Sequence, residues 1–279
     1  MTSSPAHGFA ARYRAVVGAR GRLCAGIDPH PPLLEQWGLP VSAEGVARFG
    51  EICVEALGPT AAVIKPQVAF FEAFGSAGIA ALESVIAGCR AAGAIVIADA
   101  KRGDIGSTMA AYTTAWLDDT SPLCSDAVTV SPYLGFGALA PALDAAQATD
   151  RAIIVLARTS NPEGAPVQLA RGEDGRVVGQ HIVDEAAAVN ADGRGSVGVV
   201  VGATRAHGLD LSALAGPILA PGLGAQGATA ADLADVFADA DTSWLLPASS
   251  RGVLGAGPDV AALTAACEST RDEIEAALG

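Results

Sequence analysis

Eight short apolar runs, spread along 279 residues, constrain the fold of this chain more than any other feature. Each run suits a β-strand, and helix-compatible stretches lie between them, such as Val41–Leu57, Ser107–Leu117 and Thr229–Ala238. Strands that alternate with helices form parallel sheets, and eight such units close a barrel of typically about 250 residues. The runs are Leu23–Asp28, Ala62–Pro66, Ala94–Asp99, Ala127–Ser131, Ala152–Ala157, Val197–Gly202, Pro217–Pro221 and Ser243–Pro247. We therefore predict an α/β fold, a (β/α)8 TIM barrel that forms a single domain over residues 1–279.

One stretch, residues 159–195, departs from this regular pattern. It contains the turn-forming sequences Asn161-Pro162-Glu163-Gly164 and Gly172-Glu173-Asp174-Gly175. Irregular segments of that length inside a compact domain are usually functional or mobile. We expect a long loop or insertion over 159–195, directly after the fifth strand.

Charge and cysteine content narrow the class of protein. The formal net charge is −13 and no basic run is present, which argues against a nucleic-acid partner. The uncharged stretch 211–231 is interrupted by Pro217, Pro221 and glycines, so we interpret it as strand and loop rather than a membrane span. The five cysteines are widely spaced and odd in number, and the N-terminus lacks the apolar core of a signal peptide. We expect a soluble, cytoplasmic protein with reduced thiols.

Charged residues follow the strands at one end. The third run leads into Asp99, Lys101 and Asp104, and strand alternation places Asp99 and Lys101 on the same face as Ile97. Charges at the edge of a core are costly, and barrel active sites lie at the C-terminal ends of the strands. The residues that would converge there are Asp28, Lys65, Asp99, Lys101, Asp104, Ser160, residues 221–226 and Arg251. Such an array of alternating sign keeps its carboxylates ionised and offers an ammonium as a proton donor.

A glycine-rich loop follows the seventh strand. It reads Pro221-Gly222-Leu223-Gly224-Ala225-Gln226-Gly227, and barrels often hold phosphate between the loops after strands seven and eight. Arg251 follows the eighth strand and can supply a bidentate cation. These parts predict a small phosphorylated ligand.

Together these residues resemble a known family. The segment Asp99-Ala100-Lys101-Arg102-Gly103-Asp104-Ile105, with Lys65 upstream and the glycine-rich loop downstream, resembles orotidine 5′-phosphate decarboxylase, in its longer-chain branch. The resemblance implies decarboxylation of orotidine 5′-monophosphate (OMP) to uridine 5′-monophosphate (UMP) in de novo pyrimidine synthesis, with no cofactor and no metal.

The resemblance also implies a role for each matching residue. Lys65, Asp99, Lys101 and Asp104 would form the catalytic array, in which Lys101 protonates C6 and Asp99 lies against the substrate carboxylate. The expected substrate-binding residues are Asp28 and Lys65 for the ribose, Ser160 for the pyrimidine, Pro221, Gly222, Gln226, Ser250 and Arg251 for the phosphate, and Thr108. Asp104 and Thr108 would reach into the site of a neighbouring subunit, which implies a homodimer. Ser250 stands where the family commonly has glycine, and the backbone contact at that position therefore stays open.

Simpler roles exist for several of these residues. Asp104 could cap the helix that follows it, Asp28 could initiate a turn, and Gly222 and Gly224 could form a turn without phosphate. Two rival functions also stay open. One is a Mg²⁺-dependent sugar-phosphate decarboxylase or aldolase of the related barrels, although no further glutamate stands beside Asp99 at the strand ends. The other is a non-catalytic phosphate-sugar binding barrel, which would keep Arg251 but would not need Lys101.

Overall fold

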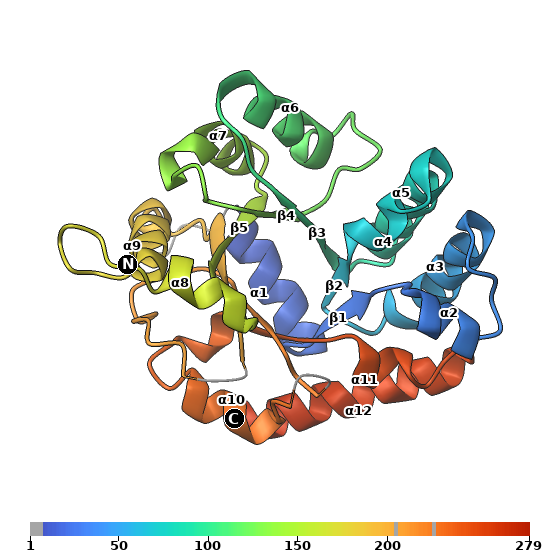
Figure 1. Ribbon diagram of the computed structural model, residues 1–279. Helices are drawn as coiled ribbons and strands as arrows, with labels where there is room; N and C mark the ends of the chain where they lie inside the picture. Colours follow the sequence, from blue (N-terminus) through green and yellow to red (C-terminus); the bar gives the residue numbers. More distant parts are fainter. Residues whose placement is uncertain (1–7, 204–205, 225–226) are drawn as a thin grey trace, which may run out of the picture.

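The eight predicted strands close into one parallel barrel. The structure, a computed structural model, describes residues 8–203, 206–224 and 227–279. Each strand pairs with its neighbours in sequence order, and β1 also pairs with β8 (Figure 1). The strands are β1 (Cys24–Ile27), β2 (Val63–Pro66), β3 (Ile95–Arg102), β4 (Ala127–Val130), β5 (Ala152–Arg158), β6 (Val197–Val201), β7 (Ile218–Pro221) and β8 (Leu245–Ser249). The prediction of a (β/α)8 barrel is confirmed.

Helices surround the barrel and cover its outer face (Figure 1). They are α2 (Pro31–Gln36), α3 (Ala43–Leu57), α4 (Val68–Glu72), α5 (Gly75–Ala91), α6 (Gly106–Leu117), α7 (Ala140–Ala148), α8 (Ala165–Gln168), α9 (Val178–Asn190), α10 (Ala230–Val236), α11 (Arg251–Leu254) and α12 (Val260–Leu278). Alternate strand residues divide between two cores. In β5, Ile153 and Val155 pack toward the helices, whereas Ile154 packs inside the barrel. Burial on both faces explains why the strands read as continuous apolar runs.

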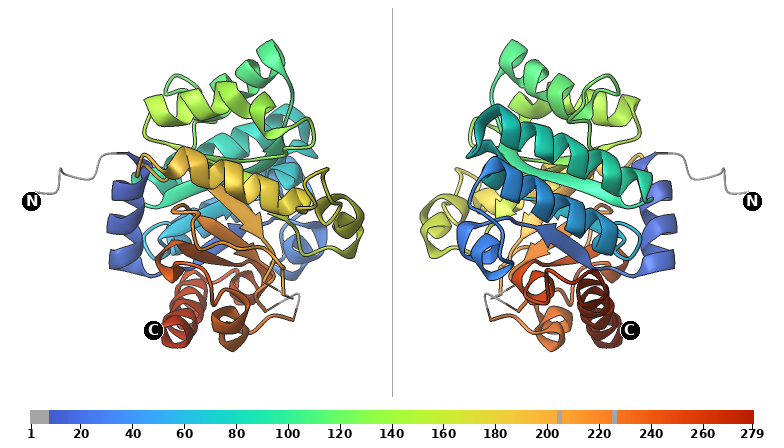
Figure 2. Two further views of the ribbon diagram at one scale, coloured as in Figure 1. Left: turned by 90° about the vertical axis from the view of Figure 1, so that its left-hand side faces the viewer. Right: turned by 90° about the vertical axis from the view of Figure 1, so that its right-hand side faces the viewer.

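A further helix, α1 (Phe9–Arg20), closes the N-terminal end of the barrel. Its residues Phe9, Tyr13 and Val17 belong to the same buried cluster as the barrel interior, and the ring of Tyr13 stacks on Trp244 with 4.9 Å between centroids. Figure 2 shows α1 across one end of the barrel and α8 at the opposite end. The C-terminal ends of the strands therefore lie at the end that α1 does not cover, where a site can form.

The stretch 159–195 is more ordered than we expected. It contains α8 and the whole of α9, so the expectation of a long irregular loop is wrong for residues 178–190. Ile182, Val183, Ala186 and Asn190 are buried along one side of α9, a helical spacing that the preceding glycine turns obscured in the sequence.

Two strands, β8 and β3, differ from their sequence-based bounds by more than one residue. β8 begins two residues late because residues 242–244 form a 3₁₀ turn, in which the Asp241 side chain accepts a hydrogen bond from the Ser243 N–H. β3 continues through Lys101 to Arg102, beyond the expected end at Asp99.

Two observations bear on the environment of the protein. In the part of the chain that the structure describes, no helix combines the length and the apolar character needed to cross a bilayer. All five cysteines are buried and free.

Candidate active site

A cavity of about 350 Å³ opens at the C-terminal ends of the strands. Nine of the twelve sequence-predicted site residues line it: Asp28, Lys65, Asp99, Lys101, Ser160, Pro221, Gly222, Ser250 and Arg251. They come from six different strands or from the residues directly after them. The apolar side chains of Leu156, Val200 and Leu219 complete the wall. The parallel barrel thus brings together residues that lie up to 223 positions apart, from Asp28 to Arg251.

Asp99 lies between two ammonium groups. Lys65 Nζ donates to Asp99 Oδ2 at 3.0 Å, and Lys101 Nζ donates to Asp99 Oδ1 at 2.6 Å. Asp99 and Lys65 are buried, whereas the Lys101 side chain is 46% exposed toward the cavity. These two residues are the only lysines in the 279-residue chain, and both pair with one carboxylate. Lys101 is therefore the more accessible of the two ammonium groups that line the cavity.

The ion pairs fix the protonation states at the centre of the site. Burial by itself raises the pKa of Asp99, but the charges of Lys65 and Lys101 and the hydrogen bonds from both outweigh it and hold the pKa well below its usual range. Burial likewise lowers the pKa of Lys65, and the negative charges of Asp99 and Asp28 reverse that effect and raise it above its usual range. Asp99 is an anion and Lys65 a cation at neutral pH.

Two residues at this centre escaped the sequence-based prediction. Gln67 Nε2 donates to the backbone carbonyl of Asp99 at 3.3 Å, and its Oε1 accepts from Lys65 Nζ at 3.5 Å. The hydroxyl of Thr129 on β4 contacts both Asp99 and the backbone of Lys101. Both positions have a recognisable sequence signal. Gln67 stands two residues after Lys65, and Thr129 is the one polar residue of an otherwise apolar strand.

Asp28 lines the cavity and has one carboxylate oxygen without a partner among the described residues. Its Oδ2 accepts a hydrogen bond from Ser250 Oγ at 2.5 Å, whereas its Oδ1 is buried and has no hydrogen-bond partner within the described residues. The turn after β1 uses only the backbone carbonyl of Asp28, which accepts from the N–H of His30. A buried carboxylate oxygen that lacks a donor, in a residue that lines a cavity, is a candidate acceptor for a ligand hydroxyl.

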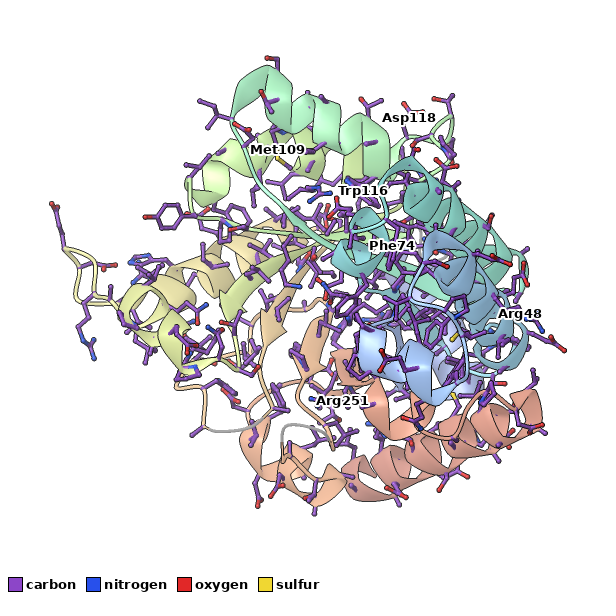
Figure 3. The ribbon with its side chains drawn as sticks, turned by 45° about the vertical axis from the view of Figure 1, so that its right-hand side comes forward. Arg48, Phe74, Met109, Trp116, Asp118 and Arg251 are labelled. Atoms are coloured by element: carbon purple, nitrogen blue, oxygen red, sulfur yellow. The ribbon has the colours of Figure 1, made fainter. Side chains whose placement is uncertain are left out.

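The glycine-rich loop approaches the cavity from β7. Pro221 and Gly222 line the cavity, and Gly222 and Gly224 have φ angles of 121° and 73°, a region that other residues rarely adopt. Figure 3 shows Arg251 where β8 leads into α11, and this arginine lines the same cavity. Gln226, the other residue predicted to hold phosphate, lies outside the described residues.

Asp104 and Thr108 lie apart from the cavity of their own chain. Neither is among the described residues that line it, and the Asp104 carboxylate accepts the N–H of Ile105 at 2.8 Å. The Asp99 carboxylate therefore groups with two lysines but not with Asp104 within one chain. The large apolar side chains that are exposed include Ile105, which directly follows Asp104, by 61%, and Tyr133 and Leu134 by 81% and 53%.

Comparison with known proteins identifies the family. The profile of the orotidine 5′-phosphate decarboxylase / HUMPS family matches residues 21–266. Relatives from Salinispora tropica and Salinispora arenicola, both named orotidine 5′-phosphate decarboxylase, are each 58% identical over 273 residues, which is 97% of this chain and 98% of theirs. The chain belongs to the orotidine 5′-phosphate decarboxylase / HUMPS family. The resemblance inferred from the sequence is confirmed.

The fold of this family member agrees with that of a solved relative. A crystal structure from Streptomyces avermitilis, described as a candidate orotidine 5′-phosphate decarboxylase, superposes with a TM-score of 0.94 at 52% identity and covers 100% of this chain and 98% of its own. The family match spans the whole candidate site from Asp28 to Arg251.

Proposed function

We propose that this chain is a carboxy-lyase that converts OMP to UMP and carbon dioxide without a cofactor, the last step of de novo pyrimidine synthesis. The arrangement that carries the proposal is Asp99 between two lysines, with the Lys101 ammonium reaching into a cavity bounded by a glycine-rich loop. The high identity to relatives of that name, over nearly the full chain, supports it.

Binding would begin at the parts of the substrate that do not react. The phosphate would lie between the glycine-rich loop and Arg251, the ribose hydroxyls beside Asp28 and Lys65, and the pyrimidine beside Ser160. The free Oδ1 of Asp28 is a ready acceptor for a ribose hydroxyl. This remote binding energy would press the pyrimidine carboxylate toward the Asp99 anion, where the two negative charges repel each other.

The chemical step relieves that repulsion. The bond between C6 and the carboxylate carbon breaks, carbon dioxide leaves, and the electron pair stays on C6. The Lys101 ammonium stabilises the developing negative charge and then transfers a proton from Nζ to C6. The amine that remains takes a proton from water, which restores the starting state of the site.

The active assembly would be a homodimer. Asp104 and Thr108 are not among the described residues that line the cavity of their own chain, and the apolar side chains of Ile105, Tyr133 and Leu134 are exposed. Apolar surface of this kind commonly marks an interaction site. Pairing two copies of the chain through it would cover these side chains and direct Asp104 and Thr108 to the site of the partner subunit.

The donor set at Asp99 favours this proposal over the Mg²⁺-dependent rival. Both oxygens of Asp99 already accept hydrogen bonds from ammonium groups, so a metal ion at this carboxylate would have to stand beside two cations. A binding-only barrel would give no role to a half-exposed ammonium held 2.6 Å from a carboxylate inside the cavity. A cytoplasmic location stays a prediction from the cysteine pattern.

The test is the fall in pyrimidine absorbance when OMP is added to the purified protein, with and without a chelator. We expect turnover that the chelator leaves unchanged, and a fall in kcat of about 10²- to 10⁴-fold in Lys101→Ala, the usual contribution of a positioned proton donor. OMP that stays intact rejects the proposal. Activity that disappears with the chelator and returns with Mg²⁺ favours the sugar-phosphate rival, and nucleotide binding without turnover favours the binding barrel.

A further inference from the structure

Thr129 is a polar residue that the proposed chemistry does not use. It lies in the middle of β4, between apolar neighbours, and is fully buried. It is not among the described residues that line the cavity, so it is not placed to contact a substrate. Its hydroxyl nevertheless touches two catalytic residues at once. The Lys101 backbone N–H lies 2.9 Å from Thr129 Oγ1, and Thr129 Oγ1 lies 2.9 Å from Asp99 Oδ1.

The direction of both hydrogen bonds is fixed by chemistry. A backbone N–H can only donate, and an ionised carboxylate can only accept. The Thr129 hydroxyl therefore accepts a hydrogen bond from the Lys101 N–H and donates its single proton to Asp99. Because a threonine hydroxyl carries one donor and lone pairs to accept, it satisfies both partners without reorientation. A carbon in its place would leave both without this partner.

The backbone of β3 explains why a side chain is needed at this point. Ala98 pairs with Val128 and Arg102 pairs with Val130, so residues 99–101 of β3 stand opposite Thr129 alone. The strand bulges there, and Lys101 has a φ angle of 49°, in the left-handed region that non-glycine residues rarely occupy. In a regular ladder a backbone carbonyl accepts the N–H of each strand residue, and here the Thr129 hydroxyl takes that place.

The bulge determines where the Lys101 ammonium lies. A left-handed backbone is unfavourable for a residue other than glycine and persists only where its surroundings enforce it. The Thr129 hydroxyl holds the backbone of Lys101, and it holds the carboxylate oxygen to which Lys101 Nζ also donates. The backbone of Lys101 is thus held by Thr129 Oγ1 directly, and its ammonium is held through Asp99 Oδ1, which the same hydroxyl contacts.

We infer that Thr129 is a positioning residue that sets the orientation of Lys101 and Asp99 relative to each other, an inference that rests on the proposed decarboxylation. Its hydroxyl keeps the carboxylate plane and the lysine backbone in register, so that the ammonium points at the carbon that loses the carboxylate. We expect substrate binding not to depend on it, because the residues proposed to contact the phosphate, ribose and pyrimidine lie on or after other strands.

The test compares Thr129→Val, which keeps the shape and removes the hydroxyl, with Thr129→Ser, which keeps the hydroxyl. We expect kcat to fall about 10- to 100-fold in Thr129→Val, the effect expected when a reacting group is misplaced by about 1 Å. KM for OMP and the Kd for UMP should change less than about threefold, since ground-state contacts remain. Thr129→Ser should retain kcat within about threefold of the wild type.

The scarcity of lysine provides a second measurement that needs no turnover. Protein labelled with ¹⁵N-lysine has only two lysine backbone amide signals, from Lys65 and Lys101, and Lys101→Arg assigns them. The Lys101 amide should be protected from hydrogen exchange in the wild type and in Thr129→Ser. In Thr129→Val it should exchange at least about tenfold faster, while the Lys65 amide is unchanged.

Each outcome decides one claim. A wild-type protein inactive on OMP overturns the proposed function, whereas the exchange rates still decide whether Thr129 holds Lys101. An active wild type with an unchanged kcat in Thr129→Val overturns the positioning role, and so does an equal loss in the valine and serine variants. If Thr129→Val does not fold, Thr129→Ala against Thr129→Ser supplies the same comparison, because these smaller side chains also differ by one hydroxyl.

Discussion

At the scale of single residues, the site depends on a buried charge balance centred on Asp99. Asp99→Asn would leave the Lys65 ammonium buried without its carboxylate. We expect the free energy of unfolding to fall by about 3–5 kcal/mol, the usual cost of removing one partner of a buried ion pair. The pKa of Lys65 should also fall, because the charge of Asp28 then opposes the effect of burial without that of Asp99. Urea unfolding measures the first effect, and the two ¹⁵Nζ lysine signals report the second.

An exposed pair offers the control for that substitution. Arg48 and Glu51 are hydrogen-bonded on the surface of α3, with both side chains more than half exposed. Glu51→Gln should cost no more than about 1 kcal/mol, as exposed ion pairs do. If Asp99→Asn and Glu51→Gln lowered the free energy of unfolding equally, burial would not be the reason that the Asp99 pair contributes more to stability.

The same pair predicts a pH dependence of stability. The pKa of Asp99 is lower in the folded chain, so its contribution is present above the unfolded value of about 3.9 and is lost as the pH falls further. The pKa of Lys65 is raised, so its contribution is present below about 10.4 and is lost as the pH rises through the folded value. The stability difference between wild type and Asp99→Asn should therefore stay constant from about pH 7 to pH 5 and shrink below about pH 4. Urea unfolding across this range would refute the assignment if the difference stayed constant at acid pH.

The contact between Asp99 and Lys101 was predictable from the sequence, but the backbone geometry that produces it was not. Alternation along a regular strand places the two side chains on one face, and their contact is confirmed. The strand is not regular there, because Lys101 is left-handed and β3 bulges against β4. A bulge depends on the hydrogen-bond partner across the sheet, Thr129, which stands 28 residues after Lys101. The sequence shows Thr129 as a polar residue in an apolar strand, but it does not show that Thr129 faces Lys101.

At the scale of strands and loops, the junction of β1 with β8 links the two residues expected at the ribose and the phosphate. Gly26 lies opposite Ser250, and a Cβ added at Gly26 would stand 2.6 Å from Ser250 Oγ and 2.9 Å from Ser250 Cβ. The missing side chain therefore makes room for the serine that holds Asp28. The contact with Gly26 and the hydrogen bond to Asp28 give a structural role to Ser250, at the position where the family resemblance led us to expect glycine.

That contact predicts a coupled pair of substitutions. Gly26→Ala alone should lower the free energy of unfolding by about 1–3 kcal/mol through overpacking and should raise KM for OMP, because it displaces Ser250 and with it Asp28. In the double variant with Ser250→Gly, most of the loss caused by the alanine should disappear, since the added methyl group then has space. Thermal or urea unfolding of the four proteins gives the coupling energy. Strictly additive losses would show that Gly26 and Ser250 do not share this space.

The elements themselves were predictable where burial is repetitive. Eight doubly buried strands and helices such as α3 and α6 repeat one pattern, and the order of the strand ends was enough to assemble most of the cavity. The helices α1 and α9 were not recognised. The first stands outside the alternation of strands and helices, and the second follows glycine-rich turns that conceal its spacing. Both are stabilised by tertiary packing, which a single sequence does not display.

At the scale of the whole molecule, the question is whether Asp104 and Thr108 serve the site of their own chain or that of a neighbouring chain. Asp104 and Thr108 belong to the sequence motif of the array but lie outside the cavity of their own chain. Sequence order cannot tell a residue that serves its own barrel from one that serves a neighbour, because both follow the same strand. The exposed side chains of Ile105, Tyr133 and Leu134 give the spatial reason for the second alternative.

The proposed dimer makes a quantitative prediction for mixed subunits. If each site combines Lys101 of one chain with Asp104 of its partner, Lys101→Ala and Asp104→Ala homodimers are both impaired. A mixed dimer then contains one site with both substitutions and one site with neither. Random exchange of equal amounts makes half of the dimers mixed, so activity should recover to about a quarter of the wild-type value, as two-fold symmetry requires.

Two controls make the mixing experiment decisive. Ile105→Asp in both chains should prevent recovery and reduce the mass measured by light scattering to that of a monomer, since it places a charge in the apolar contact. Val178→Asp, on the exposed start of α9, should change neither. Mixing Lys101→Ala with Lys65→Ala should restore nothing, because those two residues pair with the same Asp99 within one chain. If Lys101→Ala and Asp104→Ala likewise fail to complement each other after proven subunit exchange, Asp104 acts within its own barrel and the shared site is excluded.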